Sequence, residues 1–238
     1  MSHYIALVPA AGRGTRFSSG DFKSKQHTSL NGKTLLQHAV EPFMKHEKIM
    51  RVILVLAPDD KESLQQIENV NNKLMVRYVG GASRAESVLN GIRSIEAEVN
   101  DQDWILVHDA ARPLITHELI NRLIGGVSEE CDGGILAVRA VDTIKSTADT
   151  MKISNTLDRN KHWLAQTPQM FRKSILVRAL EEVKDLSQIT DESSAVEALG
   201  MRPTIVESEP SNIKVTYAQD LNYASLLLKN ASTRGISS

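Results

Sequence analysis

The sequence predicts an α/β fold with a doubly wound, mostly parallel sheet. Short apolar runs alternate with amphipathic stretches along most of the chain, which is typical of parallel strands joined by helices. The run at residues 52–57 is apolar without alternation, as expected for a strand covered on both faces. The chain has 238 residues, and we expect one domain over 1–230 and a frayed tail over 231–238.

In the first half of the chain, strands are expected at residues 4–8, 52–57, 74–79 and 104–107. A helix is expected over residues 34–46, and Pro42 inside it should cause a kink or an early break. Asp59 and Asp60 are expected to cap a short polar helix.

The pair Ser83 and Glu86 has the spacing of a capping box, and the helix it starts has one apolar stripe. Another helix is expected over 116–124 and a strand over 134–138. Between residues 142 and 166 short β-like pieces with polar faces replace this rhythm, which predicts a projecting arm.

The last third of the chain returns to helices, expected over residues 172–183 and 191–199. Strand pieces are expected at 204–206 and 213–215. Thr216 and Gln219 are expected to cap a final helix that ends near Lys229.

Composition excludes several classes of protein. Lys and Arg total 28 against 29 Asp and Glu, so the chain lacks the basic excess of a general nucleic-acid or membrane-surface protein. Its one cysteine, Cys131, excludes an internal disulfide and favours a reducing compartment. We find no apolar run long enough to span a membrane and no signal-peptide pattern, and therefore expect a cytoplasmic protein.

The small residues that follow the first strand are the first candidate site. Gly12 and Gly14 would let backbone N–H groups approach a phosphate, although a simple surface turn also explains them. The segment is neither a dinucleotide fingerprint, because Phe17 replaces the third glycine, nor a P-loop. Residues 1–30 carry four basic side chains against one acid, and Arg16 and Lys25 are the best candidates to neutralise phosphate charge.

Asp109, which follows the strand at 104–107, is the second candidate. A carboxylate just beyond a buried strand is well placed to hold Mg²⁺, but an N-cap or an ion pair with Arg112 explains it equally well. His108 is expected to be a packed histidine rather than a catalytic one. Gly80 and Gly81 could offer backbone contacts to a base at the same sheet edge.

Taken together, the motifs form an ordered set. They are PAAGRGTR at 9–16, SKQ at 24–26, GG at 80–81 with Arg84 and Ser87, VHDAARP at 107–113, DTIK at 142–145, DRN at 158–160, QTPQ at 166–169, TDE at 190–192 and NIKVT at 212–216. This set resembles the family of 2-C-methyl-D-erythritol 4-phosphate cytidylyltransferases from about residue 5 to residue 228. The resemblance implies a Rossmann-like nucleotidyltransferase fold with a projecting β-arm.

The resemblance also implies a reaction of the non-mevalonate isoprenoid pathway. The phosphate of methylerythritol phosphate attacks the α-phosphorus of CTP, with Mg²⁺ as cofactor, and pyrophosphate leaves. The implied catalytic residues are Arg16, Lys25 and Lys214. The implied nucleotide-binding residues are Ala10, Ala11, Gly12, Gly14, Gly81 and Ser87. The implied acceptor-binding residues are Asp109, which would also hold the metal, Arg112, Thr143, Arg159, Thr167 and Lys214.

The family further implies a homodimer in which the arm at 142–166 clasps a second subunit, so that Arg159 serves the neighbour's site. Four positions depart from the pattern, and one of them is Pro42 in the first helix. Ser24 and His27 flank the loop lysine where proline and an aromatic residue are usual, and Ala82 replaces an acidic residue beside the glycine pair. The last change removes an expected carboxylate contact to the nucleoside.

Other functions are compatible with much of this pattern. A cytidylyltransferase acting on ribitol 5-phosphate would share the CTP site and differ at the acceptor. A sugar-1-phosphate nucleotidyltransferase would use a uridine or thymidine donor. A non-catalytic nucleotide-binding protein of the same fold is disfavoured because Arg16, Lys25, Asp109 and Lys214 are all present.

Overall fold

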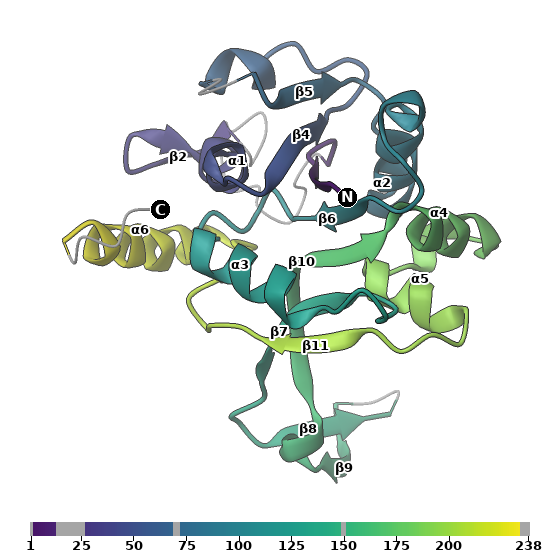
Figure 1. Cartoon of the computed structure of the whole chain (residues 1–238). Coiled ribbons are helices and arrows are strands. Elements are labelled where there is room, and N and C mark those ends of the chain that lie inside the picture. Colours follow the sequence, from purple (N-terminus) through teal and green to yellow (C-terminus); the bar gives the residue numbers. More distant parts are fainter. Residues whose placement is uncertain (1, 13–26, 69–71, 149–150, 234–238) are drawn as a thin grey trace.

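A computed structural model describes residues 2–12, 27–68, 72–148 and 151–233 (Figure 1). Within these ranges the main sheet has seven strands in the order β11-β7-β10-β6-β1-β4-β5. The strands are β1 (Tyr4–Pro9), β4 (Ile49–Val55), β5 (Leu74–Arg77), β6 (Trp104–Val107), β7 (Gly134–Arg139), β10 (Trp163–Arg172) and β11 (Thr204–Glu207). All neighbouring pairs are parallel except those that β10 forms with β6 and β7, which confirms the predicted fold class.

Two strand predictions are wrong. Strand β10 was not predicted, because the polar residues Gln166, Thr167 and Gln169 interrupt its apolar pattern; in the structure all three are buried. Conversely, residues 213–215 form no strand. In that segment the N–H of Ile213 donates to the carbonyl of Ser211 and the N–H of Val215 donates to the carbonyl of Ala111, both at 2.8 Å, instead of forming a ladder.

A small unpredicted hairpin lies before the first helix. It pairs β2 (Ser29–Leu30) with β3 (Lys33–Thr34). Asn31 and Gly32 join the two strands with φ values of 50° and 86°, the left-handed region that a two-residue hairpin turn needs.

The helices are α1 (Leu35–Lys45), α2 (Arg84–Arg93), α3 (His117–Gly126), α4 (Lys173–Glu182), α5 (Glu192–Ala198) and α6 (Ala218–Thr233). Helix α1 continues past Pro42 to Lys45, so the expected early break is wrong. The final helix runs beyond Lys229. At its start the cap differs from the prediction, because the carboxylate of Asp220 accepts the N–H groups of Thr216 and Tyr217. No helix in the described ranges is both long and apolar enough to cross a membrane.

Short 3₁₀ turns, η3 (Ser63–Gln66), η4 (Glu96–Glu98), η5 (Arg159–Lys161) and η6 (Leu186–Gln188), connect the larger elements. The Oδ1 of Asp60 accepts the N–H groups of Glu62 and Ser63 ahead of η3, as a capping residue would. The N-cap position itself, however, is Glu62, which makes no side-chain cap bond.

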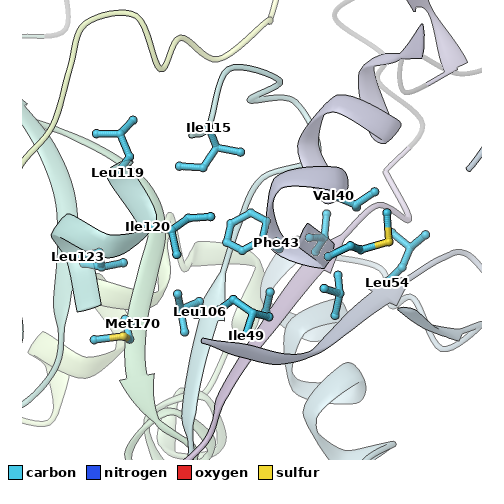
Figure 2. Packing of buried hydrophobic residues seen from close by; sticks show 14 of the residues in the cluster. Val40, Phe43, Ile49, Leu54, Leu106, Ile115, Leu119, Ile120, Leu123 and Met170 are labelled. Atoms are coloured by element: carbon cyan, nitrogen blue, oxygen red, sulfur yellow. The ribbon is translucent and has the colours of Figure 1, made fainter. Parts of the chain in front are cut away.

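Helices cover both faces of the sheet, and β1 shows why its sequence is apolar throughout. Ala6 and Val8 belong to the apolar cluster on one face of the sheet. Phe43 and Ile120 lie side by side in this cluster (Figure 2). Ile5 and Leu7 belong to a second apolar cluster, which includes residues of α2, α4 and α5. Because the central strands are buried between these two clusters, the segments that follow their carboxyl ends begin from fixed positions.

The predicted arm projects away from the sheet (Figure 1). Its end is the antiparallel hairpin of β8 (Ile144–Thr147) and β9 (Ile153–Leu157). Most of the side chains of both strands are at least partly exposed.

Candidate active site

Strands β6, β1, β4 and β5 are neighbours in this order, and each pair is parallel. The carboxyl ends of β1, β5 and β6 therefore lie at one edge of the sheet. The segments that follow β1 and β5 are in close contact. A Cβ on Gly80 would lie 2.2 Å from the Cβ of Ala11 and 2.8 Å from the carbonyl oxygen of Leu56. Gly80 thus lets the predicted nucleotide-binding residue Ala11 lie against the segment of the glycine pair.

The start of α2 completes this part of the edge. The N–H of Gly81 donates to Ser87 Oγ at 3.0 Å, and Ser87 Oγ donates to the carbonyl of Ser83 at 2.9 Å. Ser83 caps the helix as predicted, but the carboxylate of Glu86 accepts the N–H of Ala82, at 2.7 Å, instead of closing the box on Ser83. A carboxylate therefore lies beside Ala82, although residue 82 itself lacks one.

Asp109 is the centre of the second part of the site. Its side chain is 9 % exposed, and its Oδ1 accepts Arg84 Nε at 2.8 Å while its Oδ2 lies 2.7 Å from Lys214 Nζ and 3.9 Å from Arg112 Nε. Burial raises the pKa of Asp109, but the cations Arg84 and Lys214 outweigh it and hold that pKa well below its usual range. Asp109 is thus a nearly buried, ionised carboxylate.

A bulge in β10 brings Thr167 to Asp109. The ladder between β10 and β7 loses its register between Ala165 and Gln169, which takes the intervening residues out of the regular sheet. Thr167 Oγ1 accepts the N–H of Asp109 at 3.0 Å and lies 3.1 Å from His108 Nδ1.

His108 is fully buried and lies against the ring of Phe43, with 5.0 Å between the ring centroids. Its Nε2 lies 3.0 Å from the carbonyl of Arg112, which can only accept, so the neutral ring with the proton on Nε2 fits both of its partners. Burial lowers the pKa of His108 to about 4. The expectation of a packed histidine is confirmed.

These side chains line a crevice of about 250 Å³. Its walls are Arg84, Asp109, Arg112, Ala165, Gln166, Thr167, Gln169, Thr190, Asp191 and Lys214. Arg112 is anchored by the carbonyls of Asn212 at 2.7 Å and Ala165 at 3.3 Å. Asn212 in turn donates to Gln166 Oε1 and to the carbonyl of Thr167, which ties the chain before Lys214 to the β10 bulge.

The structure therefore brings together four of the predicted acceptor-binding residues, Asp109, Arg112, Thr167 and Lys214. Thr143 and Arg159 are not part of this crevice; both are exposed in the arm, where Arg159 Nη1 donates to the carbonyl of Val141 at 2.8 Å. Gly14, Arg16 and Lys25 lie outside the described residues. Gly12 is exposed, and a Cβ there would meet nothing within 4 Å.

Two residues at the site had no predicted role there. Arg84 and Glu192 were expected only as members of the GG and TDE motifs. In the structure Arg84 joins Asp109 to Glu192, with bonds of 2.5 and 3.0 Å to the Glu192 carboxylate. The two residues are 108 positions apart, so neither periodicity nor spacing could pair them. The only local signal was that each of them is a charged residue at the first position of its helix.

Asp109 is the residue that could hold a divalent metal. Both of its oxygens have a cationic neighbour, and each retains a second lone-pair position. Within the described ranges no group of three or more His, Cys, Asp or Glu side chains could hold a metal ion. One carboxylate is nevertheless compatible with Mg²⁺, which usually takes its remaining ligands from phosphates and water.

Fold and site together define a nucleotide-dependent enzyme of the doubly wound α/β class, with a charged crevice at the carboxyl edge of its sheet. Residues 4–230 match the sequence profile of 2-C-methyl-D-erythritol 4-phosphate cytidylyltransferase. The chain belongs to this family and is a cytidylyltransferase.

Relatives of the same name cover almost the whole chain. The protein from Nitrosospira multiformis is 42% identical over 97% of this chain and 99% of its own length. The protein from Nitrosomonas eutropha is 44% identical over 96% of this chain and 98% of its own. A crystal structure of a 4-diphosphocytidyl-2C-methyl-D-erythritol synthase superimposes with a TM-score of 0.82, at 38% identity, over 96% of this chain and 99% of that one.

Proposed function

We propose that the chain transfers CMP from CTP to 2-C-methyl-D-erythritol 4-phosphate in the non-mevalonate isoprenoid pathway, and that it does so in the cytoplasm. An oxygen of the acceptor phosphate forms a bond to the α-phosphorus of CTP, the bond from that phosphorus to the bridging oxygen breaks, and pyrophosphate leaves. The observation that carries the proposal is the ionised Asp109 among Arg84, Arg112 and Lys214 in the crevice of a chain of this family.

The chain's own groups bind and align the two anionic substrates, because phosphoryl chemistry needs alignment and charge stabilisation more than covalent help. Ala10, Ala11, Gly12, Gly14, Gly81 and Ser87 contact the nucleotide. Arg112, Thr167 and Lys214 bind the acceptor phosphate next to Asp109. Arg16 and Lys25, together with Lys214, stabilise the charge that develops on the transferring phosphorus. The neighbouring Glu86 carboxylate compensates for Ala82 near the nucleoside.

The charge balance of the crevice supports a metal. Among the described residues at the site, three cations, Arg84, Arg112 and Lys214, face three acids, Asp109, Asp191 and Glu192. This set alone therefore offers no excess positive charge to a triphosphate. Asp109 is the residue that would hold a Mg²⁺, which would supply positive charge for the phosphate oxygens when bound.

The arm supports a homodimer. Val141, Met151, Ile153 and Leu164 are 57 to 98 % exposed on it, an apolar surface that a second copy would cover. In the dimer the arm carries Arg159 and Thr143 to the neighbour's crevice, which explains why neither contacts the crevice of its own chain. We treat residues 1–230 as one domain, because the main sheet takes strands from Tyr4 to Glu207.

The test is pyrophosphate release from CTP and Mg²⁺ with each candidate acceptor. We expect turnover with methylerythritol phosphate and none with ribitol 5-phosphate, and a preference for CTP over UTP of about 10⁴-fold if the site hydrogen-bonds the cytosine amino group. Equal turnover of ribitol 5-phosphate would reassign the acceptor. Binding of CTP without any pyrophosphate release would instead favour a non-catalytic protein of this fold.

A further inference from the structure

Glu192 is a fully buried acid that the proposed chemistry does not use. It is the first residue of α5, and its two carboxylate oxygens accept Nη1 and Nη2 of Arg84 at 2.5 and 3.0 Å. A buried carboxylate is retained only where a partner compensates its lost hydration. Arg84 is that partner for Glu192.

The planar guanidinium of Arg84 connects this pair to the site. Its donors lie in a rigid fork, so two bonds to Glu192 determine where the third donor, Nε, points. That donor meets Oδ1 of Asp109 at 2.8 Å. The orientation of the Asp109 carboxylate therefore depends on a residue of α5, in a different part of the chain.

The two oxygens of Asp109 differ in how firmly they are held. Oδ1 is bound by Arg84, whose own side chain is clamped by Glu192. Oδ2 lies 3.9 Å from Arg112 Nε, beyond hydrogen-bond distance, and its hydrogen-bond partner is Lys214 at 2.7 Å, whose side chain is 43% exposed and can move to an arriving anion. Oδ2 is thus the oxygen that becomes available when ligands enter the crevice.

Stability alone does not explain the pair, because a buried ion pair can often be replaced by apolar residues of similar volume without loss of stability. We propose that Arg84 and Glu192 are positioning residues, which tie Oδ1 of Asp109 so that Oδ2 faces the metal-bound triphosphate and the acceptor phosphate. This inference rests on the proposed function, since it assigns Asp109 its role.

The experiment compares the charge-free double variant Arg84→Met/Glu192→Leu with wild type. We expect it to fold, with a melting temperature close to wild type, and to lose about 30–100-fold in kcat, in the range seen when groups that orient a metal ligand are removed. The KM for CTP should stay within about threefold, because the nucleoside contacts lie elsewhere.

A matched control is Arg93→Met/Glu181→Leu, which removes a pair at 2.8 Å between α2 and α4 where both side chains are about half exposed. It should leave kcat unchanged. A wild-type chain that releases no pyrophosphate would overturn the proposed function and this role with it. An active wild type with a folded, fully active double variant would overturn the positioning role alone.

A second variant decides the matter if the double variant does not fold. Glu192→Asp keeps the charge and withdraws the carboxylate by one methylene. We expect a folded protein whose kcat falls about tenfold, with the KM for CTP again within about threefold, because the guanidinium and Asp109 shift together. A kcat within twofold of wild type in this variant would overturn the proposal.

Discussion

At the residue scale, Asp109 and Lys214 are unequal partners. Asp109 is held by Arg84, Lys214 and Arg112, so the loss of one cation leaves it paired. Lys214 reaches the same carboxylate with a side chain that is 43% exposed, so its removal opens no large buried cavity and leaves Asp109 with two other cations. A change at Lys214 should therefore separate catalysis from folding.

We expect Lys214→Ala to lower kcat/KM by about 10²–10³-fold, as for the loss of a charged group that stabilises a transition state, with little change in melting temperature. Steady-state pyrophosphate release and calorimetry measure the two effects. Lys45→Ala is the control, because its Nζ is 2.5 Å from Glu41 and its side chain is 39% exposed, yet it lies outside the crevice. Equal losses in both variants would contradict the assigned role.

His108 predicts how stability depends on pH. Burial lowers its pKa from 6.5 to about 4, so the unfolded chain takes up the proton first as the pH falls. The stability that neutral His108 provides is complete above pH 6.5, and about 3 kcal/mol of it is lost on the way down to pH 4. His46, whose pKa burial also lowers, adds to the loss in the same direction.

Urea unfolding between pH 7.5 and pH 4 measures this dependence. In His108→Gln the titrating group is gone, so its free energy of unfolding should fall less steeply with pH than that of wild type. Parallel curves for the two proteins would mean that His108 does not titrate as its burial requires.

The individual residues could be predicted only where a motif carried them. Asp109, Arg112, Thr167 and Lys214 meet in the crevice as the resemblance implied. The bond from Arg84 to Glu192 could not be predicted, because it depends on how α2 and α5 pack on the sheet. The charged loop residues Arg16 and Lys25 lie outside the described residues and stay predictions.

At the element scale, the sequence predicts buried parallel strands well and irregular ones poorly. Strand β6 has its predicted bounds, because its four residues are all apolar and all buried. Strand β10 lies inside the sheet and is antiparallel to both of its neighbours. It also carries a bulge whose polar residues are satisfied by distant partners such as Asn212. Such compensation leaves no local signal, and the same irregularity brings Thr167 to the site.

The contact between the segments after β1 and β5 leads to a third prediction. In Gly80→Ala the new methyl group would lie 2.2 Å from Ala11 Cβ, so one of the two segments must shift. We expect a loss of about 1–3 kcal/mol in stability from this overpacking. We also expect a rise of about tenfold in the KM for CTP, equivalent to about 1.4 kcal/mol.

Gly125→Ala is the matched control. Gly125 lies in α3, and a Cβ there would meet nothing within 4 Å, so its stability should stay equal or rise by about 0.5–1 kcal/mol. Chemical denaturation and CTP titrations test both variants. A Gly80→Ala protein with a normal KM for CTP would show that the Ala11 segment does not contact the nucleotide.

At the scale of the whole molecule, the arm divides the predicted acceptor-binding residues between two places. Asp109, Arg112, Thr167 and Lys214 belong to the body, whereas Thr143 and Arg159 belong to the exposed arm. One chain cannot unite them in the arrangement described here. A symmetric dimer would do so, because each arm would reach the other chain's crevice.

This division predicts complementation between two inactive variants. Arg159→Ala damages the arm and Lys214→Ala damages the body, so a hybrid dimer has one site in which both residues are intact. If subunits assort at random, half of the dimers are hybrids, and co-expression should restore about a quarter of wild-type activity. Arg159→Ala with Thr143→Ala is the control, since two damaged arms leave no complete site. Recovery in the control but not in the first pair, or in neither, would show that the arm does not serve the neighbouring subunit.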